Sequence, residues 1–383
     1  MGASVGDRVV IVGGYGAFGA HVAERLARDA RLSIVIAGRS LAKARAQAAM
    51  LGAGGARARL SVAALDATTA TGEELRALAP GVLINASGPF QEQDYGLARA
   101  CIEAKCHYVD LADARGFVTG IVALDEAART AGVSVISGAS SVPGLSSAAI
   151  VEMTEGLTAL EEVHIGISPG NSFDPGTATA ASIISAAGKP FPVRAGGRRT
   201  TAYGWQRLHR YRFPEIGWRW MGDVDVPDLE LVPLHNPEVQ TVRFTAGLEV
   251  SMFHLGLWGL SWLKRAGLVR DAGALAGPML AVKRRLSMLG SDTGGMFVHV
   301  VGRDRQGQRR RRSWHLVARH GHGPYVPAIA SVILAKRLVA GADIDAAPRA
   351  GAMPCFGLFN LADFAAEVAD LDITCTLDRE GWN

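Results

Sequence analysis

Cysteine and lysine are both scarce in this chain of 383 residues. Its four cysteines form no C-x-x-C pair, so zinc or redox sites built on that spacing are not expected. We interpret all four as free thiols in a reducing compartment. Lysine occurs 6 times against 34 arginines, which we attribute to nucleotide composition. The net charge is only +4, and the one basic run, Arg309 to Arg312, is too short to indicate nucleic-acid binding.

One stretch of the sequence resembles a membrane segment. The best candidate, residues 248–263, is only 16 residues long and contains Glu249 and His254, whereas a helix that spans a bilayer needs about 20 apolar residues. Residues 1–8 are short and polar, unlike a signal peptide. We therefore expect a cytoplasmic protein without a transmembrane segment, with peripheral membrane contact through 248–263 as the minor alternative.

Glycine, in contrast, is abundant, with 46 residues. Residues 8–12 form an apolar run typical of a strand buried on both faces, and residues 20–30 carry a helical stripe. Between them stands G-x-G-x-x-G, formed by Gly14, Tyr15, Gly16, Ala17, Phe18 and Gly19. In this context the motif predicts a dinucleotide site, because glycines let a pyrophosphate approach the backbone at a helix N-terminus.

Strands and helices then alternate as far as residue 137. We predict further strands at 33–37, 59–65, 82–85, 107–111 and 133–137, separated by helices at 41–51, 72–78, 95–105 and 118–131. Such repeats predict an α/β fold with a doubly wound parallel sheet, the Rossmann arrangement. The pattern changes near residue 145. We assign 1–145 to a dinucleotide-binding domain, and 146–320 with 346–383 to an α+β domain for substrate binding or dimerisation.

The end of the second predicted strand indicates which cofactor is bound. Enzymes that use NAD usually carry an acidic residue there for the ribose 2′-hydroxyl, but residues 37–40 read Ala-Gly-Arg-Ser. Arg39 can bind a 2′-phosphate through its guanidinium group, and Ser40 can donate a hydrogen bond. The sequence therefore predicts NADP in preference to NAD. The alternative is that Arg39 is a solvated loop residue.

Ligands in such sheets bind beyond the carboxyl ends of the strands, and three further loops follow such ends. Asp66 ends the third strand and can either meet the adenine amino group or cap a helix before Thr68. The loop after the fourth strand is expected along the nicotinamide ribose, and Ser140 follows the sixth strand. The loop after the fourth strand consists of Ala86, Ser87, Gly88, Pro89 and Phe90.

Tyr95 and Asp110 are the candidates for proton transfer. Tyr95 follows the nicotinamide loop, although it can also cap a helix, and Asp110 ends the fifth strand, where it can equally be a structural acceptor of loop N–H groups. His320 and His322 lack a third ligand at a suitable spacing, so we expect no metal site.

The second half predicts a strand at 163–167, a helix at 177–187 and a hairpin of 298–302 with 313–319. The arginine run lies on one arm of this hairpin, which we interpret as a solvated edge strand. Residues 248–263 can form a buried helix, a dimer face or a lid, and we favour burial or dimerisation. We expect Trp205, Trp218 and Trp220 in the core rather than in a pocket.

Taken together, these motifs resemble the saccharopine dehydrogenase-like NAD(P)-dependent oxidoreductases. The resemblance is carried by residues 13–19, 37–40, 85–90, 100–110 and 138–143, and it is specific over about residues 8–150. It implies a Rossmann domain followed by an α+β domain, with a helix at about 321–345 that returns to the first domain. The reactions that it implies are hydride transfers at C–N bonds of amino-acid conjugates.

Three functions remain open. We favour an NADP(H)-dependent oxidoreductase that transfers a hydride to or from an imine or amino-acid conjugate. The aromatic second half suggests instead an NADPH-dependent reductase of a lipid or other apolar C=C or C=O substrate. The third function is a non-catalytic NADP-binding protein. In the favoured reading the partners are a small-molecule substrate and a second copy of the chain, without nucleic acid.

Overall fold

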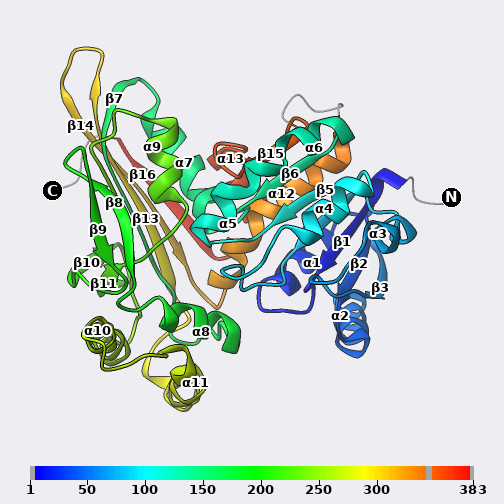
Figure 1. The fold of residues 1–383 in the computed structure, drawn as a ribbon, viewed down its shortest axis with the longest axis horizontal. Helices are drawn as coiled ribbons and strands as arrows, with labels where there is room; N and C mark the ends of the chain where they lie inside the picture. Colours follow the sequence, from blue (N-terminus) through cyan, green and yellow to red (C-terminus); the bar gives the residue numbers. More distant parts are fainter. Residues whose placement is uncertain (1–4, 342–346, 380–383) are drawn as a thin grey trace. The chain divides into compact units, whose positions relative to one another are not determined.

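The computed structural model describes residues 5–341 and 347–379, and these form two compact units (Figure 1). Within the described residues, unit 1 consists of residues 5–145, 324–341 and 347–359. Unit 2 consists of residues 146–323 and 360–379.

Unit 1 is built on a seven-stranded sheet in the order β15-β6-β5-β4-β1-β2-β3. Its strands are β1 (Arg8–Val12), β2 (Ser33–Gly38), β3 (Arg59–Ala64), β4 (Val82–Asn85), β5 (His107–Asp110), β6 (Ser134–Ser137) and β15 (Gly351–Pro354). All of the pairings between them are parallel, which confirms the predicted Rossmann sheet. The strand order reverses where β1 lies between β2 and β4, and in such sheets this is the place where ligands bind.

The helices of unit 1 are α1 (Gly19–Ala27), α2 (Leu41–Ala53), α3 (Gly72–Leu78), α4 (Gly96–Glu103), α5 (Arg115–Gly120), α6 (Asp125–Ala131) and α12 (Val326–Ala340). The single helix predicted at 118–131 is thus two short helices, joined by a 3-10 turn at Ile121–Leu124.

One stretch of the described residues, Gly323–Ala340, is long and apolar enough to cross a membrane. Most of it is α12, which packs against α1, β4 and β5. Ile329 and Leu334 are completely buried there. These contacts are typical of a core helix in a globular unit.

The prediction that 346–383 belongs wholly to the second domain is wrong. β15 pairs in parallel with β6 and so extends the sheet of unit 1. A four-residue strand has no periodicity that identifies its sheet. Its place depends on the β6 backbone, which lies far earlier in the chain.

Unit 2 contains a second seven-stranded sheet, in the order β10-β11-β12-β7-β13-β14-β16. Its strands are β7 (Leu157–Ser168), β10 (His209–Phe213), β11 (Gly217–Asp223), β12 (Thr241–Ala246), β13 (Gly294–Asp304), β14 (Arg309–Ala318) and β16 (Ile373–Asp378), beside a separate pair β8 (Pro190–Ala195) and β9 (Arg198–Tyr203). The helices are α7 (Ser146–Thr154), α8 (Gly176–Ser185), α9 (Asp228–His235), α10 (Ser251–Arg265), α11 (Ala276–Arg285) and α13 (Leu361–Glu367). β7 pairs in parallel with β12 and antiparallel with β13, so this is the mixed α+β unit that was predicted.

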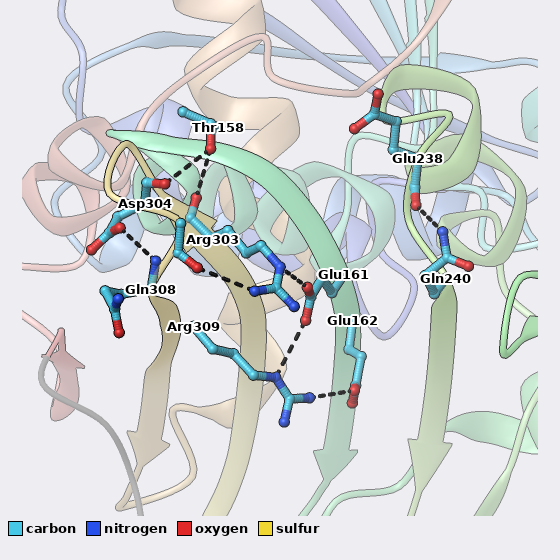
Figure 2. A network of polar contacts seen from close by, with 10 residues as sticks. Thr158, Glu161, Glu162, Glu238, Gln240, Arg303, Asp304, Gln308 and Arg309 are labelled. Carbon is cyan, nitrogen blue, oxygen red and sulfur yellow. Dashed lines mark hydrogen bonds and ion pairs between the residues drawn. The ribbon is translucent and has the colours of Figure 1, made fainter.

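The predicted hairpin is present as β13 and β14, but β14 is not an edge strand. Its residues Ser313–Ala318 pair with β16. The two strands are far apart in the sequence, so no local pattern predicts this pairing. Arg309 and its neighbours lie beyond that pairing. Figure 2 shows Arg309 between the carboxylates of Glu161 and Glu162. These ion pairs measure 3.2 and 2.7 Å, and both glutamates also line an open groove of about 430 Å³. The start of the arginine run is therefore part of a surface ion-pair network.

The tryptophans divide between core and surface. Trp205 is buried in the core of unit 2, as predicted, whereas Trp218 on β11 is 55% exposed. Arg210 of the neighbouring strand lies over the rings of Trp218 and Trp220, at 4.9 and 5.6 Å. The expectation that Trp218 lies in the core is therefore wrong, and Trp220 is only half-buried. β11 pairs with β12 only at Gly222 and Asp223, so the part of the strand that carries these tryptophans extends beyond that pairing.

Candidate functional site

The loop between β1 and α1 contains the predicted glycine motif, Gly14 to Gly19. The backbone N–H of Gly16 donates to the carbonyl of Gly13 at 2.8 Å and closes a tight turn. α1 begins at Gly19, and no side chain caps its N-terminus. The loop therefore directs backbone amides and the positive end of a helix toward the place where a pyrophosphate would lie.

This loop also contacts the loop that follows β4. Gly13 has a left-handed φ of +78°, and a Cβ there would lie 2.8 Å from the carbonyl oxygen of Ala86. A side chain at this position would push the two loops apart. The predicted pyrophosphate and nicotinamide loops are thus held against each other.

The loop Ala86–Phe90 is fixed from both sides. Asn85, which is buried, accepts from the Ser87 N–H at 3.0 Å through Oδ1 and donates to the Tyr108 hydroxyl at 3.1 Å through Nδ2. Gln93 donates through Nε2 to the carbonyls of Ser87 and Pro89, both at 2.9 Å. Asn85 stands at the start of the predicted loop, but its hydrogen bonds were not predicted, and neither was the role of Gln93. A polar residue at the end of an apolar strand was the available signal for Asn85, and nothing local indicates Gln93.

At the end of β2, Ser40 has a hydrogen-bond partner that the sequence of residues 37–40 did not indicate. The hydroxyl of Tyr15 accepts a hydrogen bond from the backbone N–H of Ser40 at 2.9 Å. Ser40 Oγ accepts from the Lys43 N–H at 3.3 Å and so caps α2. Arg39 is exposed beside this turn. Binding of a 2′-phosphate by Arg39 and Ser40 stays a prediction.

Asp66 forms a local turn after β3. Its Oδ1 accepts from the N–H and the hydroxyl of Thr68, at 3.0 and 2.8 Å. These bonds lower the pKa of the Asp66 carboxyl. The expectation that Asp66 caps a helix before Thr68 is wrong, because residues 67–69 form only a turn and α3 begins at Gly72 with Thr71 as its N-cap. The adenine contact stays a prediction.

Asp110 is completely buried where β5 and β6 end. Its Oδ1 accepts from the N–H groups of Ala112 and Gly138, at 3.0 and 2.8 Å, and from the hydroxyl of Ser137 at 3.0 Å. Burial raises the pKa of Asp110 to about 6, although these hydrogen bonds lower it. Asp110 therefore has the geometry of the structural acceptor that was its alternative role. Ser140, also buried, follows on the β6 side of this cluster.

Tyr95 connects two helices. Its hydroxyl donates to the carbonyl of Phe117 at 2.7 Å, and the two rings pack with centroids 4.8 Å apart. Burial raises the pKa of the Tyr95 phenol. Because its proton is committed to a backbone carbonyl, Tyr95 has the geometry of a clamp between α4 and α5.

The predicted cofactor residues thus follow the carboxyl ends of β1, β2, β3, β4 and β6, all at one edge of a parallel sheet. In the part of the chain that the structure describes, no cluster of three or more His, Cys, Asp or Glu residues can hold a metal. His320 and His322, in unit 2, are instead hydrogen-bonded to Asp372 at 2.6 and 2.9 Å.

Comparison with known proteins was made by sequence and by structure. Residues 9–136 match the family model of the saccharopine dehydrogenase NADP binding domain. No curated protein sequence matches the chain. Among solved structures, the chain is similar to apo saccharopine dehydrogenase (L-Glu forming) from Saccharomyces cerevisiae. That similarity has a TM-score of 0.67 at 14% identity and covers 97% of this chain and 100% of that one.

Two further structures match with lower TM-scores. A metagenomic short-chain oxidoreductase in complex with NADP has 21% identity and a TM-score of 0.26, over 35% of this chain and 83% of that one. GenD2 from gentamicin A biosynthesis, in complex with NAD, has 14% identity and a TM-score of 0.37, over 79% of this chain and 71% of that one. The domain match spans the glycine loop and the carboxyl ends of β1 to β5, and it stops one residue before β6 ends at Ser137. Over residues 9–136 the chain is therefore similar to the NADP-binding domain of the saccharopine dehydrogenases, and its fold as a whole is similar to that of the yeast enzyme.

Proposed function

We propose that the chain is an NADP(H)-dependent enzyme that transfers a hydride to or from the carbon of a C–N bond in a small amino-acid-derived substrate. The observation that supports the cofactor is the pairing of a backbone-lined glycine loop with an exposed Arg39 that has no acidic residue beside it in the β2 turn. The reaction class rests on the family, whose domain model covers residues 9–136.

The residues present fit a dinucleotide. Residues 14–19 would hold the pyrophosphate against α1, and Arg39 with Ser40 would bind the 2′-phosphate. Asp66 would lie beside the adenine, while Ala86–Phe90 and Ser140 would line the nicotinamide end. When bound, the cofactor supplies or accepts the hydride.

The two acid–base candidates contribute in other ways. Asp110 holds the ends of β5 and β6 together, and Tyr95 clamps α4 to α5. We infer that these residues orient the site and that the proton reaches the substrate nitrogen through water. Hydride transfer then depends chiefly on how the loops position the reactants.

The cofactor assignment is tested by titrating NADPH and NADH and following nicotinamide fluorescence. The wild-type protein should bind NADPH more tightly. Arg39→Ala should weaken NADPH binding by about 10–100-fold, the value of a charge-assisted contact to phosphate, and change NADH binding little. Arg45→Ala, an exposed arginine on α2, is the matched control. Equal affinity for both cofactors, or an Arg39→Ala variant that binds NADPH normally, would contradict the assignment.

The reaction class is tested by measuring NADPH oxidation with a substrate panel. Mixtures of a 2-keto acid and an amino acid, which form imines, should be turned over, and enoyl esters should not. Turnover of enoyl substrates alone would indicate a reductase of apolar compounds. No turnover across the panel, with tight NADPH binding, would indicate the non-catalytic alternative.

A further inference from the structure

Helix α10 has an apolar side that its own unit leaves uncovered. Its inner side buries Leu257 and Leu260 in a cluster with Trp205 and Ile184. On the outer side lie Met252, Leu255, Trp262 and Leu263, all exposed large apolar residues. Met252 and Trp262 are 56% and 46% exposed. Apolar side chains exposed together on one helix mark a surface that contacts something else.

The outer side also faces open space at its two glycines and carries no charge along most of the helix. A Cβ added at Gly256 or Gly259 would meet nothing within 4 Å. Between Ser251 and Leu263 the helix has no Lys, Arg, Asp or Glu. Positive charge begins only at its C-terminus, with Lys264 and Arg265.

The apolar surface continues beyond α10. Leu268 is 74% exposed, Val282 on α11 is exposed, and Met288, just after α11, is 84% exposed. α11 contributes Ala276 and Met279 to the same buried cluster as α10. Figure 1 shows both helices at one end of unit 2, next to α8.

This surface is strongly basic. Residues 251–290 contain six basic residues against a single acid, Asp271, so their net charge is 6 − 1 = +5, while the whole chain has +4. The basic residues are Lys264, Arg265, Arg270, Lys283, Arg284 and Arg285. Arg284 is paired with Asp174 at 2.8 Å. Arg265, Arg270 and Arg285 are exposed. The partner of this surface should therefore be both apolar and negatively charged.

We propose that residues 251–289 dock on the surface of an anionic lipid bilayer. The exposed apolar side chains of α10, Leu268 and Met288 enter the boundary between headgroups and acyl chains. The arginines that flank them remain at the lipid phosphates. Helices that combine an apolar side with basic flanks bind in this way, and tryptophan is enriched at that depth.

A second copy of the chain fits this surface less well. In a two-fold dimer the same patch meets itself, so each protomer would place its exposed Arg265, Arg270 and Arg285 against those of its partner. Anionic headgroups instead neutralise the charge. This inference does not depend on the reaction proposed above.

The test is flotation of the full-length protein with lipid vesicles. Wild-type protein should float with phosphatidylcholine vesicles that contain about 30% phosphatidylglycerol and should bind pure phosphatidylcholine at least about tenfold more weakly. Salt at about 0.5 M should reduce binding to the anionic vesicles by a similar factor.

Two variants probe the apolar and the charged parts separately. Leu255→Ser with Trp262→Ser, and Arg270→Gln with Arg285→Gln, should each weaken binding to anionic vesicles by about tenfold. Met50→Ser, which changes a 62% exposed methionine on α2 of unit 1, should have no effect. NADPH binding and the thermal midpoint verify that each variant is folded, and the arginine variant leaves the apolar contacts of the fold unchanged.

Three results would overturn the proposal. The first is no flotation with anionic vesicles, and the second is equal binding to both kinds of vesicle. The third is a dimer in lipid-free solution that the Leu255→Ser, Trp262→Ser variant converts to a monomer. That last result would show that a second copy covers the surface.

Discussion

Tyr15 and Ser40 join the glycine loop to the turn after β2, through the hydrogen bond from the Ser40 N–H to the Tyr15 hydroxyl at 2.9 Å. The Tyr15 ring occupies the space beside Gly38, where a Cβ would lie 2.5 Å from the hydroxyl oxygen. The loops proposed for the pyrophosphate and for the 2′-phosphate are therefore mechanically connected. A substitution in either loop should therefore alter the conformation of the other loop.

Gly38→Ala should destabilise the protein by about 1–3 kcal/mol, because an added methyl group overpacks against the Tyr15 ring. Tyr15→Ala removes that ring, so Gly38→Ala should cost much less in the Tyr15→Ala background. A double-mutant cycle of unfolding free energies in urea measures this coupling. Additive effects of the two changes would show that the ring does not enforce glycine at 38.

Stability should depend on pH through Asp110. Its pKa in the folded protein is about 6, above the ordinary 3.8. Its contribution to stability is therefore fully present below about pH 4 and is lost as the pH rises through 6, by roughly 3 kcal/mol. Asp110→Asn keeps an acceptor oxygen but cannot ionise, so the variant should gain stability relative to wild type between pH 4 and 7. Parallel plots of thermal midpoint against pH for the two proteins would contradict this.

Tyr95→Phe separates the two roles considered for that residue. The clamp to the Phe117 carbonyl predicts a loss of about 1 kcal/mol in unfolding free energy, with kcat changed by less than about threefold. A general acid predicts instead a loss of about 10²–10⁴ in kcat with little change in stability. Urea unfolding and steady-state kinetics on the same samples distinguish these outcomes.

The stability of unit 2 should depend on the carboxylate of Glu249. It accepts from Arg219 at 3.0 Å and from the N–H groups of Asn171 and Ser291, at 2.6 and 2.8 Å. Glu249→Ala leaves these donors without their acceptor and should cost about 2–4 kcal/mol. Glu230→Ala, on the exposed side of α9, should cost less than about 0.5 kcal/mol. Equal thermal midpoints for the two variants would refute the role of Glu249.

Local patterns predicted unit 1 well because its motifs are contiguous. The glycine loop, the apolar run of β1 and the absence of an acid after β2 each lie within a few residues, and the backbone geometry they need is local. The order of the strands was not predicted, because right-handed crossovers limit the alternatives without selecting one. The roles of Asp110 and Tyr95 stayed undecided, because their acceptors and donors come from other strands and helices.

The sequence alone was enough to assign the fold class: an α/β Rossmann unit with a glycine loop after its first strand, and a second α+β unit. Only the tertiary structure shows where β15 and β16 pair and which side of α10 is left uncovered. It also shows that the Tyr15 hydroxyl binds the turn after β2. These features depend on contacts between segments far apart in the chain. Such contacts form only when the core is packed, so no window of neighbouring residues contains them.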